Sequence, residues 1–212
     1  MTNFFTILAG VLIILGFIPN FVGILWDKLT VTESKWTPWL SRLNPTLKKT
    51  NPQKTSWIIW LSIDTITIIE MTVEHTLNGQ IIGAVAAGWF FVAVVMKYGQ
   101  SGWKLMDIVC FIGALLGIGL WIYFGSAVAG ILANMAALLI GSVETFRSTW
   151  EDPSQENKIA WIIYWLSCVS TLLGVTSWTW AEAAQPITFF VIESTILTLI
   201  FIPRSNQAVE YR

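Results

Sequence analysis

Three carboxylate side chains lie inside long apolar stretches of this sequence. Asp64 and Glu70 fall in the stretch 57–73, and Glu193 falls in the last stretch, 187–203. An ionised carboxylate in the middle of a membrane costs about 2.5–3.5 kcal/mol, so such a residue normally faces a cavity or a bonding partner. We therefore expect the three residues to line one anionic, outward-facing cavity that coordinates a cation or takes part in proton coupling. The alternative is a structural role, with each carboxyl group hydrogen-bonded to neighbours or protonated.

Aromatic and amide side chains accompany these carboxylates. Trp57, Trp60 and Asp64 share one helical face, at spacings of i, i+3 and i+7. Indole rings beside a carboxylate suit sugars, nucleosides or organic cations, through stacking and cation–π contact. Trp60, Trp165 and the mid-depth Asn134 are therefore candidate binding residues. The alternatives are an interfacial belt for the tryptophans and an interhelical hydrogen bond for Asn134.

Membrane-spanning helices must position these residues. Of the 212 residues, 55% are hydrophobic and only 12% are charged, whereas soluble domains carry about 25% charged residues. A span needs roughly 20 mostly apolar residues. We predict an all-α integral membrane protein with seven transmembrane helices, at 4–26, 57–73, 81–96, 105–124, 127–146, 159–178 and 187–203.

The basic residues predict the orientation of these spans. With seven spans, all twelve Lys and Arg residues fall on one side of the membrane. The positive-inside rule then places the N-terminus outside and the C-terminus in the cytoplasm, in a plasma or inner membrane. The twelve are Lys28, Lys35, Arg42, Lys48, Lys49, Lys54, Lys97, Lys104, Arg147, Lys158, Arg204 and Arg212.

The sequence contains a loose internal repeat. The segment from Gly16 to Asp27 recurs as Gly141 to Asp152, and each is followed by a proline-containing loop and a Trp-Ile-Ile sequence. The first copy has an insertion near 28–54, which we expect to lie on the membrane surface, to cover the cavity or to dock a partner. The repeat predicts a 3+1+3 plan: a three-helix unit in 1–98, a linker helix in 99–126 and a second three-helix unit in 127–212.

This plan resembles the fold of the PQ-loop and SWEET transporter superfamily. The bacterial vitamin-uptake transporters share the same plan. Members carry a Pro-Gln pair near the cytoplasmic end of the first helix of each repeat. Pro19-Asn20 stands at the matching place in the first repeat, and Val143-Glu144 stands there in the second. The resemblance implies a solute pocket between the repeats, with Pro19, Asn20 and Glu144 near the gate.

These features favour a transporter of a small polar or cationic solute that works by alternating access, either alone or with proton coupling. The alternative is a non-transporting membrane receptor or assembly factor with the same fold. A single His and two isolated Cys residues do not indicate an enzyme, a metal site or a cofactor. The net charge of −1 gives no electrostatic basis for nucleic-acid binding, and the oligomeric state is left open.

Overall fold

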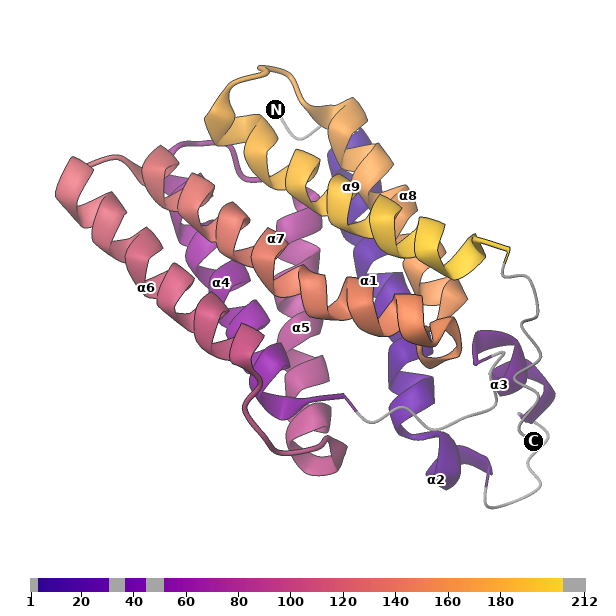
Figure 1. The fold of residues 1–212 in the computed structure, drawn as a ribbon. Helices are drawn as coiled ribbons and strands as arrows, with labels where there is room; N and C mark the ends of the chain where they lie inside the picture. The colour runs from indigo at the N-terminus through magenta and orange to yellow at the C-terminus, as the bar shows by residue number, and fades with distance from the viewer. Residues whose placement is uncertain (1–3, 31–36, 45–51, 204–212) are drawn as a thin grey trace.

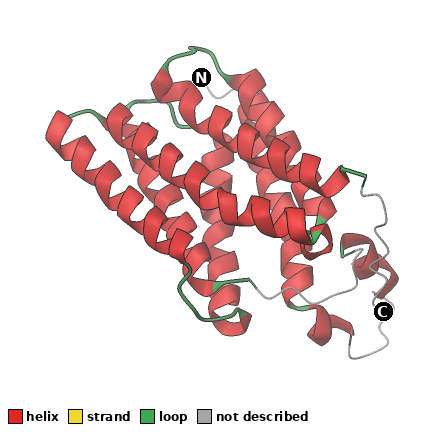
Figure 2. Cartoon of the chain, in the orientation of Figure 1, coloured by secondary structure: helices red, strands yellow, loops and turns green. Residues whose placement is uncertain are grey.

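The computed structural model describes residues 4–30, 37–44 and 52–203 as a bundle of helices joined by short loops (Figure 1, Figure 2). Apart from one isolated bridge between Gln53 and Gln100, the described residues contain no β-structure. The helices are α1 (Phe4–Ile24), α2 (Trp26–Thr30), α3 (Thr37–Leu43), α4 (Lys54–Val73), α5 (Gly79–Tyr98), α6 (Leu105–Phe124), α7 (Ala127–Glu151), the 3₁₀ turn η1 (Pro153–Gln155), α8 (Lys158–Gly174) and α9 (Trp180–Phe201).

Six of these helices are long and apolar enough to cross a membrane: α1, α4, α5, α6, α7 and α9. The other predicted span is α8, which is apolar but has 17 residues. At 1.5 Å per residue it covers about 25 Å, less than the roughly 30 Å of a hydrocarbon core. The prediction of an all-helical membrane protein is confirmed, with α8 shorter than expected.

The connection between the last two helices differs from the sequence-based prediction. α8 ends at Gly174 rather than at 178, and α9 begins at Trp180 rather than at 187. The Glu182 carboxylate explains the difference, because it accepts hydrogen bonds from the backbone N–H groups of Thr176 (2.8 Å) and Ser177 (2.6 Å). These bonds hold the connection as a turn and start α9 early.

The early start of α9 changes the setting of two residues. Pro186, expected in the first turn of its helix, lies inside α9, where it cannot donate a hydrogen bond to the carbonyl of Glu182. Glu193, expected as the seventh residue of its span, lies 13 residues after Trp180, about 20 Å along the helix. The correction brings Glu193 to the middle of the bundle.

Six helices pack in a closed ring, in the order α1, α5, α4, α7, α9 and α8, and α6 lies outside it. α5 packs between α1 and α4, and α9 packs between α7 and α8. For reference, we call α1, α4 and α5 the first group and α7, α8 and α9 the second. The two groups are in contact through α1 with α8 and through α4 with α7, while α6 lies at the periphery against α7 (Figure 1). At the α1–α8 contact, the Ser167 hydroxyl donates to the Ala9 carbonyl across 2.8 Å.

Glycine allows α1 and α5 to approach closely. A Cβ atom on Gly83 would lie 2.7 Å from the carbonyl oxygen of Gly10, and one on Gly10 would lie 2.8 Å from the carbonyl oxygen of Gly79. Side chains cannot be accommodated at such distances, and small residues are the usual means by which membrane helices pack closely. These contacts fix the position of α5 within the first group.

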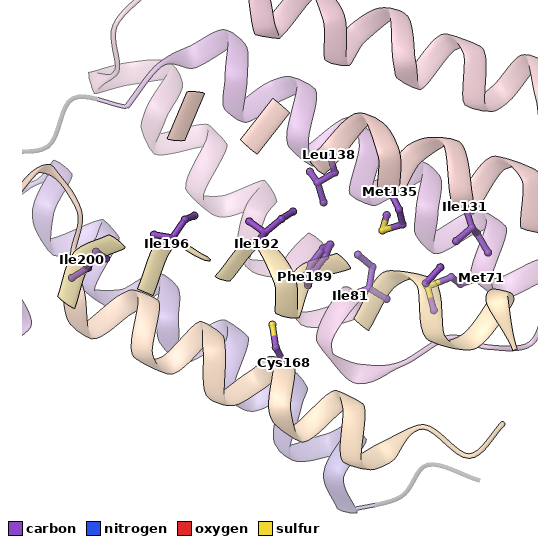
Figure 3. Packing of buried hydrophobic residues seen from close by; sticks show 11 residues of the cluster. Met71, Ile81, Ile131, Met135, Leu138, Cys168, Phe189, Ile192, Ile196 and Ile200 are labelled. Atoms are coloured by element: carbon purple, nitrogen blue, oxygen red, sulfur yellow. The ribbon is translucent and has the colours of Figure 1, made fainter. Parts of the chain in front are cut away.

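Apolar side chains fill the interior and also cover the outside of the bundle. The largest interior cluster joins α7, α8 and α9 and extends to Met71 and Ile81 (Figure 3). Outside, Phe90, Leu105 and Ile122 are each more than two thirds exposed, at 74%, 72% and 76%. An exposed apolar exterior fits contact with lipid.

The two ends of the bundle differ in charge. Helices α1, α5, α7 and α9 end, and α4, α6 and α8 begin, at the end that we call the basic end. Every Lys and Arg among the described residues lies there, and the opposite end is called the far end. The remaining five basic residues, Lys35, Lys48, Lys49, Arg204 and Arg212, fall outside the described residues.

Candidate functional site

A cavity of about 690 Å³ runs from the basic end into the middle of the bundle. Gln53, Lys104 and Glu144 line its mouth, and Asp64 and Glu193 line its inner end. The expected cavity opened toward the opposite side of the membrane. The direction differs because apolar side chains, among them Met71, Ile81 and Ile131 (Figure 3), occupy the interior at the far end. Buried amide side chains fill the same region.

Asp64 and Glu193 bring two carboxylates to the inner end of this cavity from α4 and α9. Glu193 is only 7% exposed. Among the described residues, neither Oδ1 of Asp64 nor Oε2 of Glu193 has a hydrogen-bond partner, although both atoms are buried. Because buried polar atoms are normally paired, these two oxygens are available to a ligand.

Aromatic rings form much of the cavity wall. Trp57 lies against Phe91 with ring centroids 4.4 Å apart, and against Trp60 with centroids 5.7 Å apart. Phe17 contacts Phe91 and Tyr164, each at 5.5 Å. As the sequence predicted from their spacing, Trp57, Trp60 and Asp64 share one face of α4, and this face borders the cavity.

The charged side chains at the mouth have hydrogen-bond or ion-pair partners. Asp107 accepts hydrogen bonds from the Ser56 hydroxyl (2.6 Å) and from the backbone N–H of Lys104 (2.8 Å), while the Lys104 ammonium group pairs with Glu144 at 3.1 Å. The half-exposed Lys104–Glu144 pair is a weak surface ion pair. Glu144, a predicted gate residue, therefore lies at the entrance of the cavity.

A second polar contact at the mouth involves Glu156. The Trp161 indole N–H donates to its carboxylate across 2.7 Å. Burial raises the pKa of Glu156 above its ordinary value, and the hydrogen bond from Trp161 opposes this rise. The mouth thus contains a carboxyl group that is partly shielded from water.

The predicted gate residues of the first repeat lie within α1. Pro19 is buried inside this helix, and its carbonyl oxygen accepts a hydrogen bond from Asn157 at 3.4 Å. Asn20 borders the cavity and donates to the Tyr164 hydroxyl across 2.8 Å. This bond joins α1 to α8 along the cavity wall.

Glu70 and Asn134 do not border the cavity. Glu70 is fully buried, and one of its oxygens accepts a hydrogen bond from the Asn134 amide across 2.9 Å. The other oxygen, Oε1, packs on Gly130 of α7. Of the three carboxylates expected around one cavity, Glu70 therefore has the structural role. On an α-helix, the side chains of Asp64 and Glu70 point about 120° apart, so one can face the cavity while the other faces a neighbouring helix.

Trp165 also lies away from the cavity. Its indole N–H donates to the Ser194 hydroxyl across 2.9 Å, and its ring packs on Phe190 at a centroid distance of 6.0 Å. Both contacts are between α8 and α9. Trp165 thus fastens two helices of the second group together and does not contribute to the cavity wall.

Three amide side chains close the far end, and two of them, Gln80 and Gln185, are fully buried; none of the three was a predicted site residue. Asn78 donates to Gln185 across 2.7 Å, and Gln185 donates to Gln80 across 3.1 Å. Gln80 in turn donates to the sulfur of Cys168 across 3.0 Å, and Cys168 contacts Glu193. We call Asn78, Gln80 and Gln185 the amide chain. It links the far end to the inner end of the cavity.

Comparison with known proteins gives no family assignment. No protein-family model, curated protein or solved structure matches this chain. Any function must therefore be argued from the cavity and the residues around it.

Proposed function

We propose that this chain is a membrane transporter that moves a small polar or cationic solute by alternating access. The observation that carries the proposal is a cavity that reaches Asp64 and Glu193 from the basic end, while the far end is closed. A path to the middle of the membrane from one side is what one half of an alternating-access cycle requires. Closing the basic end and opening the far end would complete the cycle.

The two groups of helices would be the moving parts. We propose that α1, α4 and α5 form one repeat, that α7, α8 and α9 form the other, and that α6 links them. In support, the helix that packs between the other two in each group, α5 or α9, is the last of the three along the chain. If α1, α4 and α5 correspond to α7, α8 and α9, the α1–α8 contact corresponds to the α7–α4 contact, as a parallel repeat requires. Both contacts are present. The cavity then lies between the repeats.

The amide chain is the barrier that must open at the far end. Gln80 and Gln185 belong to different groups and are fully buried. When the groups separate, each amide exchanges its protein hydrogen bond for one to water, so the net cost is about 0.5–1.5 kcal/mol per bond. A polar barrier of this kind is less costly to hydrate than an apolar one.

The basic residues support one orientation of the cycle. Since Lys and Arg concentrate on the cytoplasmic side of membrane proteins, we propose that the basic end faces the cytoplasm in a plasma or inner membrane. The cavity described above then belongs to the inward-open state.

The experiment is solute uptake into liposomes that contain the purified protein. Solutes that raise its melting temperature in detergent are selected first from sugars, nucleosides, vitamins, amines and metal cations. Uptake of a selected solute should fall about tenfold or more in Asp64→Asn and Glu193→Gln, because each removes a charged hydrogen-bond acceptor. Glu74→Gln changes a carboxylate near the far end and serves as the matched control. Uptake that both cavity variants leave unchanged would exclude this site.

A second candidate is a receptor or assembly factor. In its favour, the cavity formed by the described residues opens only at the basic end, and Leu40 of α3 packs on Val22 and Trp26 beside that end. This packing holds a helical segment where a partner protein can reach it. A solute that binds the protein but is never taken up into liposomes would favour this candidate.

A further inference from the structure

The cavity is strongly acidic, and this restricts the charge of its ligand. Its one basic side chain among the described residues, Lys104, is paired with Glu144 at the mouth. An anionic solute would therefore meet repulsion with no free basic partner, whereas a cation is attracted. The carboxylates that line the cavity are Asp64, Asp107, Glu144, Asp152, Glu156 and Glu193.

The inner carboxylates differ from those at the mouth in their bonding. Side chains of the protein donate to all four carboxylates at the mouth, Asp107, Glu144, Asp152 and Glu156. At the inner end, Cys168 contacts Glu193, but Oε2 of Glu193 and Oδ1 of Asp64 are buried without a partner in the described part of the chain. A buried, unpaired carboxylate oxygen is costly, and a bound cation removes that cost. The geometry therefore favours the inner end as the cation site.

The surroundings favour an organic cation over a metal ion. The described residues contain no group of three His, Cys, Asp or Glu side chains placed to hold a metal. The volume of about 690 Å³ is that of a pocket for a small organic molecule. Trp60 precedes Asp64 by about one helical turn, so an indole ring lies beside this carboxylate, where its face can attract a cation.

We propose that the solute is an organic ammonium cation, with its charged nitrogen between Asp64 and Glu193 and its hydrocarbon body against Trp57 and Trp60. This inference rests on the proposed function only in taking the cavity as the solute site. It also goes beyond that function, because it excludes sugars, nucleosides and anions as the preferred ligands.

The test compares ligands that differ in charge but not in shape. Binding of choline and of 3,3-dimethylbutan-1-ol, in which carbon replaces the nitrogen, is measured by calorimetry with the full chain in lipid nanodiscs. Choline should bind about tenfold more tightly or better, because its positive charge is attracted to the carboxylates and the neutral carbon of the alcohol is not. Benzyltrimethylammonium should bind more tightly still, and benzoate should not bind. Equal affinities for choline and the alcohol, or binding of benzoate, would overturn the proposal.

Variants locate the site. Glu193→Gln and Asp64→Asn should each weaken benzyltrimethylammonium binding by about tenfold, while Glu74→Gln should leave it unchanged. Glu193→Asp retains the charge and should keep the preference for choline, which separates loss of charge from a folding defect. Trp60→Leu should weaken benzyltrimethylammonium binding by about two- to fivefold. Unchanged affinity in both Glu193→Gln and Asp64→Asn would contradict the site.

Uptake measurements then separate the two proposals. A cation that binds in the cavity but does not enter liposomes would contradict the transport function and support the cation site. Uptake of an uncharged solute, with no binding of choline or benzyltrimethylammonium, would support transport and overturn the cation site.

Discussion

Glu70 accepts a hydrogen bond from Asn134 across 2.9 Å, and this bond joins α4 to α7 where the two groups of helices meet. Both side chains are fully buried. A carboxyl group inside an apolar span thus serves the assembly of the bundle, while Asp64, six residues earlier in α4, borders the cavity. The two carboxyl groups of α4 therefore lie in different surroundings, one between helices and the other on the cavity.

Removing the Asn134 side of this pair should destabilise the protein. Asn134→Leu leaves Glu70 buried without its donor, so we expect a loss of about 1–3 kcal/mol in the free energy of unfolding, measured by titration with dodecyl sulfate. The double variant Glu70→Met/Asn134→Leu removes both polar groups and should recover part of the loss, with a coupling energy near 1 kcal/mol. Additive effects of the two substitutions would show that the bond contributes nothing.

Opening at the far end should be visible at Cys168. The chain has two cysteines, both free and buried, so Cys110→Ser leaves Cys168 as the single thiol. In this background Gln185→Leu breaks the amide chain, and a membrane-impermeant thiol reagent added at the far end should label Cys168 about tenfold faster. Ile187→Ala changes an outward-facing residue of the same helix and is the control. Equal labelling rates would mean that the amide chain is not the barrier.

Close packing of α1 and α5 should make Gly83 intolerant of a side chain. Gly83→Ala places a methyl group 2.7 Å from a backbone carbonyl oxygen, so we expect a loss of about 1–3 kcal/mol in the free energy of unfolding. Gly119→Ala is the matched control, because nothing lies within 4 Å of its added Cβ. Removing a helical glycine there should be neutral or stabilising by up to about 1 kcal/mol. Equal effects at both positions would contradict the close approach.

Glu156 should make the stability of the mouth depend on pH. Because burial raises the pKa of Glu156 above its ordinary 4.5, the folded state binds more protons than the unfolded state between these two values. The free energy of unfolding therefore falls as pH rises through this window. The Glu156→Gln variant does not lose stability in this way. The difference between its melting temperature and that of the wild type should therefore shift in favour of the variant as pH rises above 4.5. A constant difference between pH 4 and 8 would contradict the shift.

Features that follow from the periodicity of a single helix could be predicted from the sequence. The shared face of Trp57, Trp60 and Asp64 depends only on 3.6 residues per turn, and the structure places all three on the cavity. The partner of Glu70 could not be predicted in this way. It depends on which face α7 presents to α4, and that is decided by packing between distant parts of the chain.

Features that depend on a helix boundary were harder to predict. Glu193 was recognised as a carboxylate inside a span, but it lies further along its helix than predicted, because the predicted span began at 187 and α9 begins at Trp180. Gln80 and Gln185 were assigned to loops for a related reason, since one follows Asn78-Gly79 and the other precedes Pro186. The signal in the sequence that could have identified them is an uncharged amide at the edge of an apolar stretch.

The size of the cavity has a thermodynamic consequence. A volume of 690 Å³ corresponds to about 20 water molecules at the density of the liquid, about 30 Å³ each. A solute that enters must return part of this water to the bulk, and burial of its hydrocarbon surface gives binding a negative heat-capacity change. The hydration of the cavity is therefore one of the quantities that set its affinity, and calorimetry at several temperatures measures it.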